Sequence, residues 1–278
     1  MLHQIIAWLL CAANAVLSLA ELPPLPAGQT LDLSRFTLTW QDEFDGDALD
    51  SEKWGGHGFR EGAHKRRDGW WALETLEVRD GMLHIPSFYS EEGVAGGPAG
   101  YYSCGIDTRG RFEQQFGYFE VRCMLPKGQG LWSAFWLMPQ AFGTTPEDGR
   151  TGAEIDVYES AYHKDSWPKK NSVSSAVHYG GYGDNLHSQG VGRWLVLPKP
   201  YDTFHTYGLE WNQDEYIFYI DGRETGRSAF GGVSQNPEYL LLSVEHQLDG
   251  WAGDIRENSV MTDFVVDYVR VYQYKDME

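Results

Sequence analysis

Cysteine is scarce in this sequence, and the residue spacings that mark many metal sites are missing. Of 278 residues only three are cysteines, Cys11, Cys104 and Cys123. Neither C-x-x-C nor H-E-x-x-H occurs, so the sequence predicts no catalytic zinc and no cofactor for catalysis. Cys104 and Cys123 lie in two β-like stretches, and antiparallel pairing in an oxidising compartment would allow them to bond. The alternative is two buried thiols that never pair, and neither arrangement bears on catalysis.

Basic residues are also few. The chain has 22 lysines and arginines against 40 aspartates and glutamates, a formal net charge of −18 and a pI near 4.8. Nucleic acids and anionic membranes require a basic surface, so the sequence predicts neither as a partner. The same charge disfavours strongly anionic polysaccharides as substrates, although a local basic patch would still serve one.

Long apolar runs are confined to the start of the chain. Met1 to Ala20 contains an apolar stretch that ends in small residues at Ser18-Leu-Ala20, although only His3 stands where lysine or arginine is usual. We predict a signal peptide over residues 1–20, an N-terminal leader over 21–36, and a secreted protein, extracellular or periplasmic, with no membrane attachment in its mature form. The alternative is an uncleaved anchor, since the stretch is barely long enough to span a bilayer.

No helical periodicity persists beyond two turns. Strand signals recur instead over residues 76–85, 117–125, 134–138, 154–160, 174–179, 205–211, 216–220, 239–245 and 263–274. The dipeptides Asp80-Gly81 and Asp221-Gly222 mark turns between strands, and the second matches a two-residue hairpin. With no internal repeat and no second domain, we predict a single all-β sandwich over residues 37–274, and we expect a monomer.

The most informative segment is the E-x-D-x-x-E run from Glu154 to Glu159, which lies among β-formers. Hydrolysis of a glycosidic bond typically needs two carboxyl groups in different protonation states, one a nucleophile and the other a proton donor. On a regular strand Glu154 and Asp156 point to one face and Glu159 to the other. A one-residue β-bulge near Val157 or Tyr158 would return Glu159 to the acidic face. Three acids would then line one groove.

Crowding changes the protonation of these acids. Like-charge repulsion and partial burial raise the pKa of at least one carboxyl group, so that a glutamate can keep its proton at neutral pH and donate it as a general acid. From the hexamer alone, a surface cation site and a solvated acidic strand are alternatives. The segments around the hexamer favour the glycosidase.

Those segments form an ordered set of motifs. They are Trp40-Gln-Asp-Glu-Phe-Asp-Gly46 followed by Leu49-Asp50 and Trp54, Arg79-Asp-Gly-Met-Leu83, Gly117-Tyr-Phe-Glu-Val-Arg122, Gly128-Gln-Gly-Leu-Trp-Ser-Ala-Phe-Trp-Leu-Met-Pro139, Tyr207-Gly-Leu-Glu-Trp211, Tyr219-Ile-Asp-Gly222 and Val266-Asp-Tyr-Val-Arg-Val-Tyr272. With these in order over roughly residues 37–273, the chain resembles glycoside hydrolase family 16, the laminarinase, lichenase, agarase and carrageenase group. The resemblance implies a concanavalin A-like β-jelly-roll of two curved antiparallel sheets with an open substrate groove.

The resemblance also implies an activity. It points to an endo-acting, retaining hydrolase of a β-linked polysaccharide, with β-1,3- or mixed β-1,3-1,4-glucan as the first candidate. By position, Glu154 would be the nucleophile, Glu159 the acid/base, and Asp156 the residue between them that tunes their charge. A retaining mechanism places the two carboxyl groups about 5–5.5 Å apart. Two glutamates that flank Asp156 on one bulged strand are able to close that gap.

Aromatic residues make up 14% of the chain. Sugars present apolar C–H faces and hydroxyl groups, so a groove that mixes tryptophan with carboxylates suits a glycan. Trp132 and Trp136 alternate toward one face just before the acidic strand, and Trp251 lies in a glycine-flanked loop where family members often carry a substrate-facing tryptophan. His178 stands where the family often places a histidine near the groove. These four are candidate substrate-binding residues, with a structural role as the alternative for each.

Some positions depart from the family pattern. Glucan-cleaving relatives usually have Trp-Pro-Ala where this chain has Trp132-Ser-Ala134, a methionine at the position of Tyr158, and often an arginine near Ile106. These departures leave open a red-algal galactan of the agar, porphyran or carrageenan type, and also transglycosylation by capture of the covalent intermediate. A non-catalytic carbohydrate-binding jelly-roll is an alternative that predicts the loss of at least one acid, whereas all three are present.

Many family members also carry a structural calcium on the convex face. By position its ligands here would be Asp267, the backbone carbonyl of Gly81 and the region of Glu43. Calcium takes carboxylate and carbonyl oxygens, so these groups suit it chemically. A salt bridge at Asp267 is the alternative.

Overall fold

The computed structural model describes residues 28–56, 62–142, 148–162 and 171–277. The predicted signal peptide, residues 1–20, and residues 21–27 of the leader lie outside this range, so both stay predictions. Among the described residues, no helix is long and apolar enough to cross a membrane. The described end of the leader contacts the rest of the fold, because the Leu31 N–H donates to the Gly222 carbonyl at 2.8 Å and Arg35 pairs with Glu210 at 2.8 Å.

Most regular structure in the described chain is β-strand. The strands are β1 (Phe36–Asp42), β2 (Gly55–Gly56), β3 (His64–Arg66), β4 (Gly69–Trp71), β5 (Glu77–Arg79), β6 (Met82–Ile85), β7 (Phe88–Ser90), β8 (Gly100–Ser103), β9 (Gly105–Asp107), β10 (Gly117–Met124), β11 (Leu131–Pro139), β12 (Glu154–Ala161), β13 (Ser172–Tyr179), β14 (His187–Val196), β15 (His205–Trp211), β16 (Tyr216–Ile220), β17 (Arg223–Ser228), β18 (Glu238–His246) and β19 (Phe264–Tyr274). Short 3-10 helices lie before, between and after them: η1 (Leu33–Arg35), η3 (Leu73–Thr75), η4 (Gly149–Thr151), η5 (Gly183–Asn185), η6 (Ile255–Glu257) and η7 (Lys275–Met277).

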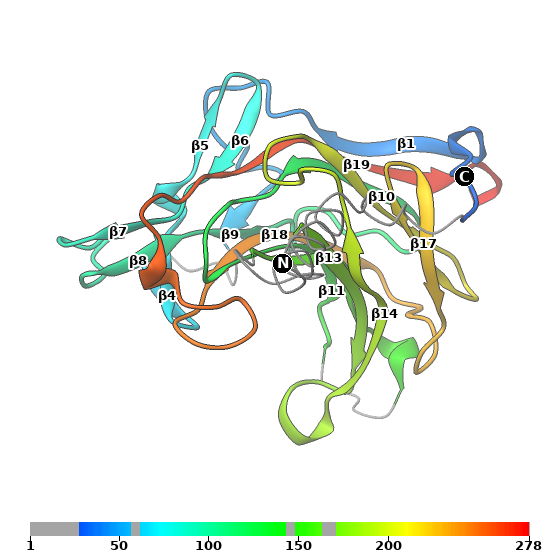
Figure 1. The fold of residues 1–278 in the computed structure, drawn as a ribbon. Helices are drawn as coiled ribbons and strands as arrows, with labels where there is room; N and C mark the ends of the chain where they lie inside the picture. The colour runs from blue at the N-terminus through cyan, green and yellow to red at the C-terminus, as the bar shows by residue number, and fades with distance from the viewer. Residues whose placement is uncertain (1–27, 57–61, 143–147, 163–170, 278) are drawn as a thin grey trace, which may run out of the picture.

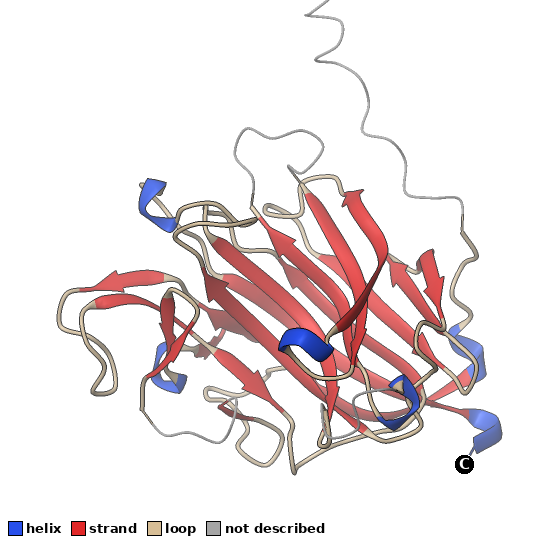
Figure 2. Cartoon of the chain, turned by 90° about the horizontal axis from the view of Figure 1, so that it is seen from below, coloured by secondary structure: helices blue, strands red, loops and turns tan. Residues whose placement is uncertain are grey.

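Two antiparallel sheets form the two layers of the fold (Figure 1). One has the order β17-β16-β15-β10-β19-β6-β5, with β1 also paired to β19. The other has the order β14-β13-β12-β11-β18-β9-β2 and carries the acidic strand β12. Seen from below, the long strands of the sandwich run side by side (Figure 2). The predicted all-β sandwich is confirmed.

The inner faces of the two sheets share one core. Phe119 and Trp211 of the eight-stranded sheet pack there with their rings 6.0 Å apart, and Phe135 and Leu137 enter from β11. Burying an apolar side chain of this size contributes roughly 1.5–3 kcal/mol. Because side chains alternate along a strand, the residues of β11 that alternate with Phe135 and Leu137 point away from the core. They form the floor of a groove on the outer face of the seven-stranded sheet.

A third, small sheet lies at one end of the sandwich. It has the order β3-β4-β8-β7, and β4 and β8 pair in parallel through Trp70 and Tyr102. Its strands β4, β7 and β8 lie to the left of the main sheets in Figure 1. Strands of three or four residues are too short to show a period, and the sequence analysis did not predict this sheet. It matters for function because Arg66, the last residue of β3, lies beside the groove.

The predicted turns are present. Asp80 and Gly81 join β5 to β6 with φ of 55° and 70°, and Asp221 and Gly222 join β16 to β17 with φ of 49° and 69°. Two consecutive positive φ angles are what a type I′ hairpin requires. Besides the small sheet, the strands that the sequence did not predict are β1, β2, β9, β14 and β17.

The two described cysteines are buried and free. Cys123 lies in β10 of the eight-stranded sheet, whereas the Cys104 carbonyl accepts the N–H of Val244 in β18, at 3.1 Å. They therefore belong to opposite layers and not to neighbouring strands. The bonded alternative is wrong, and the alternative of two buried thiols is confirmed.

Candidate active site

The bulge predicted on the acidic strand is present. Phe135 of β11 pairs with Tyr158, and the next residue, Trp136, pairs with Asp156. Val157 is therefore the extra residue on β12. Both Val157 and Tyr158 are packed in the core, so two consecutive side chains of the strand point inward. The usual alternation of side chains between the two faces then resumes.

The bulge brings the three acids to one face. Glu154, Asp156 and Glu159 line a single pocket of about 240 Å³ on the outer face of the sheet. On the other side of β12 the Ser175 hydroxyl donates to the Val157 carbonyl at 2.8 Å, which satisfies a backbone group that the bulge takes out of the ladder. The bulge is therefore a fixed part of the site.

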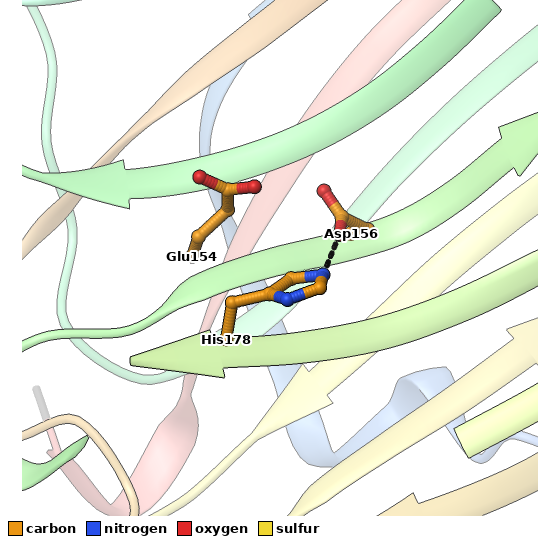
Figure 3. Close-up of side chains that lie close together, drawn as sticks. All are labelled: Glu154, Asp156 and His178. Carbon is orange, nitrogen blue, oxygen red and sulfur yellow. Dashed lines mark ion pairs between the residues drawn. The ribbon is translucent and has the colours of Figure 1, made fainter. Parts of the chain in front are cut away.

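A histidine on the neighbouring strand holds the central acid. His178 of β13 directs Nε2 at Asp156 Oδ2, 2.9 Å away (Figure 3). Its Nδ1 lies 2.7 Å from the Ser188 hydroxyl. Burial opposes the charged imidazolium, but the hydrogen bond to Asp156 and the nearby carboxylates outweigh burial and raise the pKa of His178 to about 9. At neutral pH a positive charge therefore stands among the acids.

The two glutamates hold protons more tightly than free glutamate does. Burial, and then the charge of Asp156, raise the pKa of Glu154 to about 7, although a hydrogen bond from Tyr182 and the charge of His178 oppose the shift. Burial and the charge of Asp156 also raise the pKa of Glu159 well above its ordinary value. A carboxyl group that stays protonated near neutral pH beside one that ionises is the pair that glycoside hydrolysis needs.

The predicted aromatic residues lie around these acids. Trp132 and Trp251 meet edge to face with ring centroids 5.1 Å apart, and with His178 they line a second pocket of about 540 Å³ that shares Glu154 and Glu159. Trp136 lines the smaller pocket but is only 5% exposed, and its indole N–H donates to the Ser243 hydroxyl at 3.1 Å. Trp132, Trp251 and His178 are thus placed to touch a ligand, and Trp136 forms part of the floor.

Four further ionisable side chains that the sequence did not single out line the groove. They are Arg66, Arg67, Tyr182 and Glu245. Both arginines contact the buried carboxylate of Glu245, and the Arg67 guanidinium lies 4.0 Å from the centre of the Trp132 ring. The basic run Lys65-Arg-Arg67 in so acidic a chain was the available signal.

The residues proposed for calcium lie apart from this groove. Glu43 accepts two hydrogen bonds from Arg270, at 2.7 and 2.8 Å, and Asp267 contacts Arg122. Gly81 lies in the turn between β5 and β6. An ion would have to compete with these guanidinium groups, and the calcium site stays a prediction.

The acids of the groove also resemble a cation site. Three possible metal-ligand atoms, one from each of Glu154, Asp156 and His178, lie within 4.8 Å of one another. The His178 Nε2 and Asp156 Oδ2 atoms are already at hydrogen-bond distance, 2.9 Å. We therefore interpret this group through its proton chemistry.

Comparisons with known proteins agree with the geometry. Residues 38–274 match the family model described as the GH16 domain of β-porphyranases A–D. Glucan endo-1,3-β-glucosidase A1 of Niallia circulans is 28% identical over 274 residues, covering 87% of this chain and 38% of that protein. The β-glucanase of Rhodothermus marinus is 30% identical over 262 residues, covering 85% of each.

A solved structure shows the same fold. SCLam, a non-specific endo-β-1,3(4)-glucanase from family GH16, superposes with a TM-score of 0.70 at 26% identity over 90% of this chain and 96% of that one. Some relatives are much longer: the chain spans 38% of glucosidase A1 and 40% of the endo-1,3-1,4-β-glycanase ExsH of Rhizobium meliloti. With its family match over residues 38–274 and its two-sheet jelly-roll, the chain belongs to glycoside hydrolase family 16.

Proposed function

We propose that this chain is an endo-acting, retaining glycoside hydrolase of a β-linked polysaccharide. The observation that carries the proposal is the bulge at Val157, which puts Glu154 and Glu159 in one pocket on either side of Asp156. A groove on the face of a sheet admits the middle of a polymer, and this supports internal cleavage. We also propose that the protein is secreted, to the extracellular space or the periplasm, and acts as a monomer after removal of residues 1–20.

The chemistry has two steps. Glu154 attacks the anomeric carbon and forms a bond to it, while the bond from that carbon to the leaving oxygen breaks and Glu159 supplies the proton. Water then attacks the same carbon, gives its proton to Glu159 and releases Glu154. Asp156, held by His178, lies between the two glutamates and discourages both from ionising at once.

A neutral β-1,3- or mixed β-1,3-1,4-glucan is the first candidate substrate. The activities for which glucosidase A1, the Rhodothermus β-glucanase and SCLam are named support it. The Trp132 and Trp251 rings offer a surface for the apolar face of a sugar ring. The net charge of −18 also favours an uncharged polymer.

A sulfated red-algal galactan is the second candidate, because of Arg66 and Arg67. The two guanidinium groups share one carboxylate, Glu245, so the cluster carries a net positive charge in the wall of the groove. This is a local basic patch of the kind that an anionic polymer requires. The description of the matching family model, β-porphyranase, points the same way.

One assay separates these substrates. The purified mature chain is incubated with laminarin, mixed-linkage β-glucan, agarose, porphyran and carrageenan, and reducing ends are measured over time. Release from the first two supports the glucan, and release from porphyran or carrageenan supports the galactan. An Arg67→Gln variant should lose activity on a sulfated polymer far more than on a neutral one.

The catalytic roles are tested on whichever polymer is cleaved. Glu154→Gln and Glu159→Gln should each abolish hydrolysis with an unchanged fold, and exposed Glu92→Gln serves as the control. The Glu159 variant should recover turnover on a substrate with an activated leaving group, because such a group departs without a proton. Early NMR of the products should show a retained anomeric configuration; inverted products or full activity in either variant would contradict the assignment.

A further inference from the structure

Tyr182 lies in the groove without a role in the steps above. It follows β13 in the loop that leads into η5, and it is 61% exposed. The glycines around it, Gly180, Gly181 and Gly183, have φ of 87°, 85° and 75°. This left-handed backbone favours glycine and turns the loop sharply, which places the Tyr182 ring at the wall of the groove.

The side chain is held at both ends. Its hydroxyl donates to Glu154 Oε2, and its ring meets Phe142 edge to face with centroids 5.1 Å apart and planes at 62°. Phe142 follows the end of β11 and Glu154 begins β12, so one tyrosine connects three segments at the same end of the groove. A ring packed on one side gives the phenol a defined direction toward the carboxylate.

We propose that Tyr182 is a positioning residue for Glu154, which fixes the direction of its carboxylate and keeps it ionised for attack. This rests on the proposed role of Glu154 as nucleophile. A carboxylate that accepts a hydrogen bond through one oxygen is held with the other oxygen free to reach the anomeric carbon. When the covalent intermediate breaks down, the negative charge returns to the Glu154 carboxylate, and the Tyr182 hydroxyl stabilises it by donating the same hydrogen bond while keeping its own proton.

The charges around Glu154 come from several elements. Asp156 on the same strand favours the protonated carboxyl group, whereas His178 on β13 and Arg66 on β3 favour the carboxylate. Glu159, two residues beyond the bulge, also interacts electrostatically with Glu154. None of these is altered by removing the Tyr182 hydroxyl. Tyr182→Phe keeps the ring against Phe142 and removes the hydrogen bond alone.

The test compares Tyr182→Phe with wild type and with Tyr179→Phe. Tyr179 lies three residues earlier and stacks on His187 with centroids 4.7 Å apart, so it is a matched tyrosine with a different neighbour. Hydrogen bonds to charged groups are worth enough that losing this one should lower kcat on the cleaved polymer about tenfold to a hundredfold. The acid limb of kcat/KM should move to higher pH in Tyr182→Phe only.

A second readout does not depend on activity. Carbon-13 NMR of labelled glutamate side chains follows the Glu154 carboxyl group directly, and its pKa should be higher in Tyr182→Phe than in wild type. An unchanged titration of Glu154, or equal effects of Tyr182→Phe and Tyr179→Phe, would overturn the proposal. If wild type cleaves none of the polymers, the proposed function fails while the titration still decides whether Tyr182 controls Glu154.

Discussion

Glu238 offers a sharp test of electrostatics within the fold. It begins β18 and is fully buried, with Oε1 accepting the Ala153 N–H at 3.3 Å and Oε2 without a partner among the described residues. Burial raises the pKa of Glu238 from an ordinary value of 4.5 to about 8. The folded protein therefore holds this proton at a pH where the unfolded chain has released it.

The sign and size of the effect follow from proton linkage. Between pH 4.5 and 8 the folded state binds one more proton at Glu238 than the unfolded state, so the free energy of unfolding falls as the pH rises. The contribution is fully present below pH 4.5 and is lost as the pH passes 8. At about 1.36 kcal/mol per pH unit, raising the pH from 5 to 7.5 removes roughly 3 kcal/mol through this group.

The perturbation is Glu238→Gln, which keeps the shape and the acceptor for Ala153 but cannot ionise. We expect the free energy of unfolding, measured in urea, to fall between pH 5 and pH 7.5 by about 3 kcal/mol less in the variant than in wild type. The groove acids and His178 also titrate, but they do so equally in both proteins. Exposed Glu92→Gln should follow wild type. If Glu238→Gln and wild type change in parallel with pH, Glu238 is not protonated in the folded state and the reasoning is wrong.

Three further changes test the groove and the convex face. Ser175→Ala removes the hydrogen bond to the bulge at Val157, so we expect the free energy of unfolding in urea to fall by about 1–3 kcal/mol and kcat to fall as well. Activity equal to that of wild type would mean that the bulge keeps its shape without this hydrogen bond. Trp251→Ala should raise KM more than it lowers kcat, because a sugar-stacking ring is lost while the acids stay; steady-state kinetics decide this. Thermal unfolding with calcium and with excess chelator tests the metal, and unchanged midpoints in both wild type and Asp267→Ala would count against it.

The sequence was sufficient for features that depend on local pattern. Alternation on β12 already required a bulge if Glu154 and Glu159 were to share a face, and the Asp-Gly dipeptides at Asp80 and Asp221 required tight hairpins. The strands of the core were long enough to show a period of two. These are properties of neighbouring residues, and the structure has them.

The rest of the groove depends on contacts between distant segments. Glu245 is about 180 residues from Arg66, and they meet because the small sheet packs beside β18. No spacing rule connects such residues, and the short strands β3 and β4 show no period. The contact between Tyr182 and Glu154 likewise depends on the path of a glycine-rich loop, which side-chain patterns do not encode.

The pairing of the first and last strands has a consequence for how the chain folds. Thr37 in β1 is the register partner of Gln273 in β19, and β19 lies between β10 and β6 in the middle of its sheet. Topologies dominated by such non-local contacts fold slowly, in milliseconds to seconds for small domains. On the ribosome, the layer that backs the groove cannot close until residues 264–274 have emerged, so β1 waits without its partner strand until then. The active strand β12 is synthesised before β19, so the layer that supports it is completed only after the catalytic residues have been made.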